Sequence, residues 1–150
     1  MKLKLGDILL VRNYGLLGLY IRKMTKSKYN HCCIYIGRGI VVDTDLWGVR
    51  YRRITAYNSI PHKLLRVKNI PKKTLHKICK YARTLTNTGK RYNILSLFGI
   101  KSELGKTYNC SQMINSVYAK FSIILSDKFI TVSPADIERS KLTYIVKKWK

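Results

Sequence analysis

The sequence predicts an α+β fold in which a small antiparallel sheet or barrel packs against helices. Short apolar runs rich in β-branched and aromatic residues dominate residues 6–69, and two stretches with helical spacing follow, at 71–89 and from residue 110. Because strand and helix patterns are mixed along the chain, the α+β class fits better than a repeating βαβ order. With 150 residues, no linker-type segment and no internal repeat, the chain is expected to form one domain, 1–150.

The strand pattern is clearest in two neighbouring segments. "HCCIYIG" (31–37) and "IVVDTDL" (40–46) flank the turn residues "RG", which predicts a β-hairpin. A short helix with a basic end is predicted over 16–24. Further strands are predicted at 6–12, 47–54, 62–69 and 142–149.

Three helical segments are expected in the second half of the chain. Over 71–89 the apolar residues recur with helical spacing and lysines occupy the opposite face. A second helix should begin at Cys110, with Asn109 and Gln112 spaced as a capping box, and "SPADIERS" (133–140) should form a short capped turn. The inward face of the second helix is predicted to carry Cys110, Ile114, Val117, Tyr118, Phe121 and Ile124.

The charge of the chain is strongly positive. Lys and Arg number 30 against 7 acidic residues, a net charge of +23. Such a field attracts nucleic acid, an anionic membrane surface or another anionic polymer, although a solvated surface with biased residue usage explains the composition equally well. The 11 tyrosines could stack on bases, but no nucleic-acid-binding motif is recognised.

The four cysteines do not have the spacing of a disulfide framework. Adjacent Cys32 and Cys33 should point to opposite faces of a strand, so free thiols and a reducing, cytoplasmic compartment are favoured. "HCC" and "HKIC" lack paired metal-ligand spacing, so neither a metal nor a cofactor is expected. Asp7 and Arg12 interrupt the apolar start of the chain, which therefore indicates no export signal or membrane span.

A thiol at a helix N-terminus is chemically distinctive, because unpaired backbone amides and the helix dipole favour its thiolate form. Cys110 therefore becomes a candidate nucleophile that needs a base. His31 begins the best strand, and Asp43 and Asp45 lie on the facing strand, where acids are disfavoured. With a three-residue turn at 37–39 both acids share the His31 face, whereas a two-residue turn reverses the parity and removes them from it.

Simpler roles remain open for each residue taken alone. A buried inert thiol is the ordinary role of a cysteine such as Cys110, and a structural role is ordinary for His31. The two acids could pair with nearby arginines, such as Arg50 or Arg52.

Four motifs together resemble the circularly permuted papain-like (NlpC-type) hydrolases of the YiiX/YebB kind, which are related to lecithin:retinol acyltransferase-like enzymes. They are "GDILL", "HCCIYIGRGIVVDT", "YNCSQMI" and "SPADIERS", in order from residue 6 to about 140. The resemblance implies Cys110 as nucleophile, His31 as base and Asp43 as the third polar residue, with Asp45 as its geometric rival. It also implies a nucleophile-bearing helix near the C-terminus. Gln112 departs from an acid common in the family, and Asp43 from a glutamate.

The function expected from these residues is that of a thiol hydrolase cleaving an amide bond, with peptide crosslinks such as cell-wall peptides as the first substrate class. A lipid-directed thioesterase or acyltransferase and a basic nucleic-acid-binding module are the alternatives. Tyr108, Ser111 and Gln112 are the expected pocket residues around the nucleophile.

Overall fold

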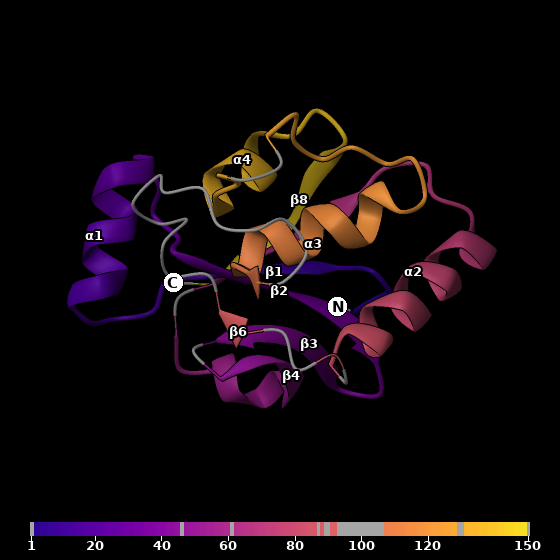
Figure 1. Cartoon of the computed structure of the whole chain (residues 1–150), viewed down its shortest axis with the longest axis horizontal. Coiled ribbons are helices and arrows are strands. Elements are labelled where there is room, and N and C mark those ends of the chain that lie inside the picture. Colours follow the sequence, from indigo (N-terminus) through magenta and orange to yellow (C-terminus); the bar gives the residue numbers. More distant parts are fainter. Residues whose placement is uncertain are drawn as a thin grey trace.

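The computed structural model describes residues 2–45, 47–60, 62–86, 88, 91–92, 107–128 and 131–149 (Figure 1). The predicted α+β class is confirmed. The strands are β1 (Ile8–Val11), β2 (His31–Gly37), β3 (Ile40–Asp45), β4 (Gly48–Arg53), β5 (His62–Val67), β6 (Arg91–Tyr92), β7 (Thr107–Tyr108) and β8 (Thr143–Trp149). The helices are α1 (Leu16–Thr25), α2 (Lys72–Leu85), α3 (Cys110–Ala119) and α4 (Pro134–Arg139), with a 3₁₀ turn, η1, at Ile54–Tyr57.

In the described part of the chain the main sheet has six antiparallel strands in the order β4-β3-β2-β1-β5-β8. The predicted strands at 6–12, 31–37, 40–46, 47–54, 62–69 and 142–149 all occur, with small shifts at their ends. β6 and β7 form a separate parallel pair.

The two faces of the main sheet differ in how much they bury. One face carries Ile8, Leu10, Ile34 and other apolar residues into a large core that α2, α3 and α4 complete. Figure 1 shows α3 crossing the middle of the sheet, with α2 beside it and α1 at the opposite edge of the molecule. The other face carries a smaller cluster, which includes Cys33, Val41 and Tyr57. Cys32 and Cys33 thus lie on opposite faces, as the strand alternation predicts.

The hairpin of β2 and β3 combines a two-residue turn with a bulge. Arg38 and Gly39 form the turn, both with positive φ (54° and 72°), as the tight turns of twisted hairpins require. Gly37 faces Ile40, but Tyr35 faces Val41, so one extra residue lies in β2 between these pairs. A two-residue turn alone would have put Asp43 and Asp45 on the face of the sheet opposite His31. The extra residue in β2 reverses this, so both acids lie on the same face as His31.

Capping fixes the start of α3. The Asn109 side chain accepts the N–H of Gln112, and the Gln112 side chain accepts the N–H of Asn109, which confirms the predicted capping box. The predicted extent was wrong, because the helix ends at Ala119 and Ser122 adopts a φ of 60°. Phe121 and Ile124 therefore lie beyond the helix, and α4 and β8 still follow it toward the C-terminus.

α1 is held beside the sheet by a close approach at Gly18. A Cβ there would lie 2.2 Å from the Asn30 side chain and 2.8 Å from the Asn13 carbonyl oxygen, so only glycine fits. Asn30 in turn accepts the Asn13 N–H at 2.8 Å. Among the described helices, α1 included, none combines the length and apolarity needed to cross a membrane.

Candidate active site

His31 and Asp43 meet at the open end of the β2–β3 hairpin. The Nε2 atom of His31 lies 2.6 Å from Oδ1 of Asp43, and both side chains are buried. The register explains the contact, since β2 and β3 are paired only as far as Ile34 and Val42. Beyond that pair each strand bonds to its outer neighbour, β1 or β4, and the two side chains close the opening between them.

Asp43 accepts several other hydrogen bonds and remains ionised. The Tyr57 hydroxyl donates to Oδ2 at 2.6 Å, and the Thr44 N–H donates to Oδ1 at 2.7 Å. Arg52 Nε forms an ion pair with Oδ2 at 3.0 Å. Burial raises the pKa of Asp43, but the His31 charge and these partners outweigh it and hold the pKa below its ordinary value.

Asp45 shares the His31 face by alternation, but the structure places its carboxylate against arginines. Arg50 and Arg52 both donate to Oδ2, Arg52 at 2.8 Å. Of the two candidate acids, Asp43 is the one in contact with the imidazole. Arg52 contacts both carboxylates. The expected pairing with arginines is therefore found for both acids, but Asp43 also contacts His31.

Cys110 is the first residue of α3, and its thiol is buried against β2. Ser111 Oγ lies 3.3 Å from the Cys32 sulfur and 3.9 Å from the Cys110 sulfur. α3 packs against both β2 and β3, the two strands that separate beside His31. The N–H groups of Cys110 and Ser111 precede the capped N–H of Gln112 and have no acceptor within the helix.

The electrostatics of Cys110 favour its thiolate. A hydrogen bond from Cys32 lowers the pKa of Cys110, burial opposes this, and the His31 charge lowers the pKa further, so that the net shift is well below the ordinary thiol value. For His31, burial lowers the pKa, but the charges of Asp43 and Cys110 outweigh it and the net pKa is raised. Each group is among the causes of the other's shift, and both shifts favour the same pair of charge states, a thiolate and an imidazolium.

The other thiols differ from Cys110. Burial raises the pKa of Cys32, Cys33 and Cys79, so each stays protonated near neutral pH. Cys32 therefore keeps an S–H that can donate toward the Cys110 sulfur, in line with the lowered pKa of Cys110. All four cysteines are free and buried.

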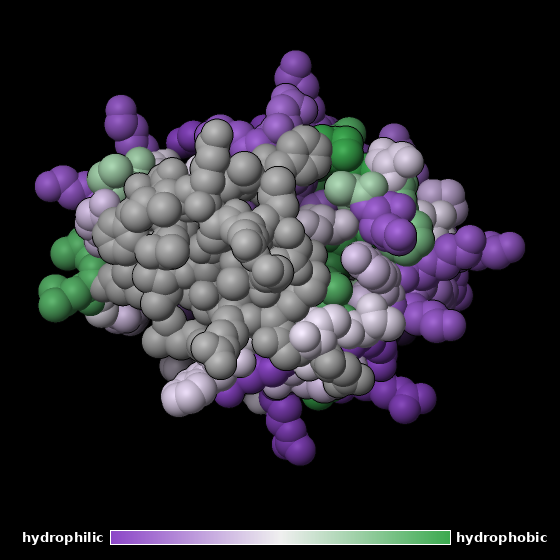
Figure 2. All heavy atoms as spheres, in the orientation of Figure 1, coloured by the Kyte–Doolittle hydropathy of each residue, from purple (hydrophilic) through white to green (hydrophobic). Residues whose placement is uncertain are grey.

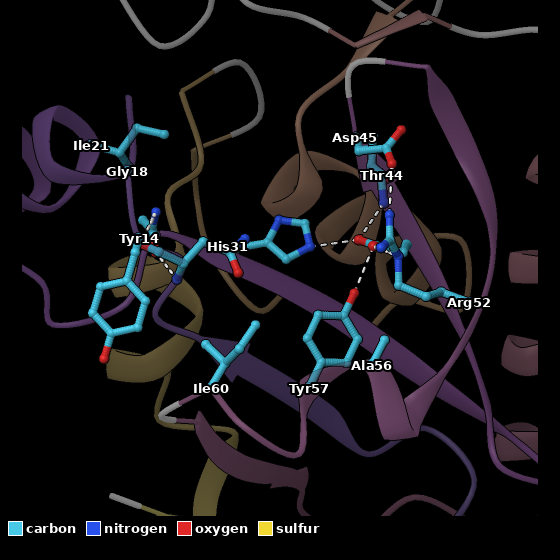
Figure 3. Close-up of a pocket in the computed structure, with 13 residues that line it drawn as sticks. Tyr14, Gly18, Ile21, His31, Thr44, Asp45, Arg52, Ala56, Tyr57 and Ile60 are labelled. Atoms are coloured by element: carbon cyan, nitrogen blue, oxygen red, sulfur yellow. Dashed lines mark hydrogen bonds and ion pairs between the residues drawn. The ribbon is translucent and has the colours of Figure 1, made fainter. Parts of the chain in front are cut away.

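A cavity of about 300 Å³ opens beside His31 and Asp43 (Figure 3). One wall is formed by Thr44, Arg52 and Tyr57, and the opposite wall by Tyr14 and the Gly18 side of α1. In the close-up the His31 ring points toward Tyr57 and Arg52. These are two other side chains that bind the Asp43 carboxylate. Thr44 Oγ1 is buried without a hydrogen-bond partner among the described residues. The cavity thus has a charged end, formed by Asp43, Asp45 and Arg52.

The three expected pocket residues have different positions. Ser111 is buried between the Cys32 and Cys110 sulfurs, and Gln112 is part of the capping box. Neither belongs to the lining of the 300 Å³ cavity. Tyr108 is in β7, and its side chain lies outside the described part of the structure.

Sequence reasoning did not assign Tyr57 and Cys32 to the site. Tyr57 ends the 3₁₀ turn η1, a segment with neither strand nor helix periodicity, so its position could not be found from pattern. Cys32 carries a weak signal, since its place next to His31 on a strand puts it on the opposite face, toward the helix layer.

The remaining histidines are held elsewhere. His62 packs on Trp149 with ring centroids 4.2 Å apart, and His76 is exposed on α2. Within the described ranges, no three His, Cys, Asp or Glu side chains gather in a group that could hold a metal ion.

The fold places the chain in one structural class, an α+β protein with the YiiX-like fold. The crystal structure of the metalloprotein YiiX from Escherichia coli O157:H7 superposes with a TM-score of 0.79 over 97% of each chain, at 15% sequence identity. This likeness shows the fold. No protein-family model and no curated protein sequence matches the chain.

Proposed function

We propose that this protein is a thiol hydrolase that cleaves an amide bond through Cys110, His31 and Asp43 on a permuted papain-like scaffold. The observation that carries the proposal is the 2.6 Å contact between His31 and Asp43 beside a thiol at a helix N-terminus. Asp43 binds Nε2 of His31, so Nδ1 of the same imidazole is left to interact with the Cys110 thiol. A nucleophile, a base and an orienting group are then arranged in sequence.

The reaction follows from these roles. The Cys110 thiolate attacks the carbonyl carbon of an amide, and the N–H groups of Cys110 and Ser111 stabilise the oxyanion that forms. The His31 imidazolium donates its proton to the leaving amine, which departs and leaves a thioester on Cys110. His31, now neutral, takes a proton from water, and the resulting hydroxide equivalent hydrolyses the thioester. Asp43 remains ionised throughout and stabilises the charged ring.

Peptide crosslinks are the first substrate class, as the sequence resemblance suggests. The cavity beside His31 has a charged end formed by Arg52 and Asp45, which suits a substrate with polar groups flanking the scissile bond. Acyl esters undergo the same chemistry, so a panel of peptide amides and acyl esters separates the two substrate classes.

The first test measures alkylation of the four thiols by iodoacetamide as a function of pH. Cys110 should react at mildly acidic pH, well below the ordinary pKa of a thiol, because its pKa is lowered while those of Cys32, Cys33 and Cys79 are raised. Intact-mass measurement after mixing with an activated acyl ester should then show one acyl group, absent in Cys110→Ala. Equal alkylation of all four thiols would contradict the proposal.

A further inference from the structure

The outward face of α1 is apolar, unlike that of an ordinary surface helix. Leu16 is 88% exposed, Leu19 56% and Met24 62%, and Tyr20 lies on the same arc of the helix. Figure 2 shows hydrophobic side chains projecting at the edge of the molecule where Figure 1 places α1. The inward side of the helix is the Gly18 and Ile21 side, which packs on the cavity wall.

The charge around this face has one sign. Between residues 8 and 42 the sequence contains no Asp or Glu, whereas Arg12, Arg22, Lys23, Lys26 and Lys28 all fall within or next to the helix. Lys23 lies within the exposed apolar arc, and Lys26 follows it at the end of the helix. An exposed apolar arc bordered by cations is the pattern of a helix that lies in the interface of an anionic bilayer.

We propose that α1 docks this protein on an anionic lipid bilayer, with Leu16, Leu19 and Met24 inserted at the level of the headgroups. A lipid surface satisfies both features, because acyl chains accept the apolar side chains and anionic headgroups accept the lysines. Nucleic acid or a polysaccharide would leave the leucines in water. A second copy of the chain would place two faces of the same sign against each other.

Docking through α1 would also orient the candidate active site. Tyr14, Gly18 and Ile21 line the 300 Å³ cavity, and they belong to the same helix or the turn that leads into it. The cavity would then lie behind α1, on the side of the helix that faces away from the bilayer. The docking itself does not depend on catalysis, so its test requires only binding.

The test is co-sedimentation of the full chain with vesicles of phosphatidylcholine, with or without about one third phosphatidylserine. The wild type should bind the mixed vesicles and bind pure phosphatidylcholine weakly. Leu16→Ser with Leu19→Ser should lower the partition coefficient about tenfold or more, because two apolar anchors are lost. Lys23→Gln with Lys26→Gln should lower it about tenfold.

Two matched controls separate the α1 face from general charge and stickiness. Lys77→Gln with Lys80→Gln removes the same charge from the exposed face of α2, and Ile145→Ser removes an apolar side chain that is 48% exposed on β8. Both should change the partition coefficient less than about twofold. Far-UV circular dichroism checks that each variant keeps its helices.

Hydrogen exchange on the wild type gives a second readout that needs no substitution. The amides of α1 should exchange more slowly when mixed vesicles are present. Unchanged exchange in α1 despite binding, or wild-type partitioning of the Leu16/Leu19 variant, would overturn the proposal in favour of diffuse electrostatic adsorption. A dimer seen by light scattering without lipid and abolished in that variant would overturn it in favour of self-association.

Discussion

Two buried carboxylates, Asp7 and Asp43, lie at opposite ends of the β2–β3 hairpin and are held by different partners. Asp7 is completely buried, and its carboxylate accepts hydrogen bonds from Nε and Nη2 of Arg66, at 2.7 and 2.8 Å. Asp43 is 2% exposed and contacts a histidine, a tyrosine and an arginine. A guanidinium keeps its proton at all accessible pH values, whereas an imidazole can pass its proton on.

Burial of an acid does not by itself indicate a functional site. Asp7 ties the start of β1 to β5 through its two hydrogen bonds from Arg66, which is a structural role. Asp43 is connected through His31 to a thiol whose pKa is lowered. Four substitutions test whether the two carboxylates really differ in this way.

The largest effect is expected for His31→Ala. Without the imidazolium, Cys110 loses a charge that lowers its pKa, and alkylation at mildly acidic pH should slow about 10²- to 10³-fold. The measurement is the rate of iodoacetamide incorporation at Cys110 by peptide mass spectrometry. His62→Ala is the control, and a rate for His31→Ala within twofold of wild type would show that the two groups are independent.

Asp7→Asn should reduce the free energy of unfolding by about 3 kcal/mol, because it leaves the largely buried Arg66 guanidinium without its countercharge. Urea unfolding followed by circular dichroism measures the change. The alkylation rate of Cys110 in the folded variant should equal that of the wild type. A slowed rate would mean that the Asp7 end of the hairpin is coupled to the thiol.

Asp43→Asn should slow Cys110 alkylation about 10- to 100-fold, since the neutral amide no longer stabilises the imidazolium. The matched control is Asp45→Asn, which removes the same charge from the same strand. The Asp45 carboxylate contacts Arg50, Arg52 and the Trp47 N–H rather than the imidazole, so this variant should leave the rate nearly unchanged. The reverse outcome would assign the orienting role to Asp45.

Asp43→Asn should also change how the free energy of unfolding depends on pH in the acidic range. Because the folded pKa of Asp43 lies below its ordinary value of 3.8, its contribution is complete above that value and is lost as the pH falls through the folded pKa. Asp43→Asn lacks this contribution, so its unfolding free energy should fall less steeply with acid than that of the wild type. Parallel urea titrations at several acidic pH values measure the difference.

The smallest effect is expected for Tyr57→Phe. The variant loses one hydrogen bond to Asp43 at 2.6 Å and keeps the ring, so stability should fall by about 1–2 kcal/mol. Alkylation of Cys110 should slow less than about threefold, since His31 keeps its own contact. A larger loss of alkylation than in Asp43→Asn would rank the tyrosine above the carboxylate.

Much of the fold could be predicted from local pattern. The strands of the hairpin and the caps of α3 and α4 depend on neighbouring residues, such as Asn109 with Gln112 and Ser133 with Asp136. The end of α3 could not be predicted, because the apolar spacing continues to Ile124 while the chain turns at Ser122. Periodicity placed Cys110, Ile114, Val117 and Tyr118 inward correctly, but Ile124, beyond the end of the helix, is 40% exposed. The pattern does not report where tertiary packing stops a helix.

The sequence predicted His31, Asp43 and Asp45 as candidate site residues, but it did not predict which acid contacts the imidazole. The alternation of residues placed His31 and the two acids on one face, given the right parity. Which acid touches the ring depends on the separation of β2 and β3 beyond Ile34, and on Arg52 drawing Asp45 away. Tyr57 comes from a turn that only the three-dimensional path of the chain brings to Asp43.

The bulge in β2 also limits how this hairpin can be altered by engineering. Its two-residue turn and single extra residue act as one unit, and together they decide which side of the sheet each later side chain of β3 occupies. Inserting one amino acid at the tip would exchange the side chains of β3 that face the helix layer with those that face the smaller cluster. An epitope or a cross-linking handle grafted at residues 38–39 would therefore have to add residues in pairs.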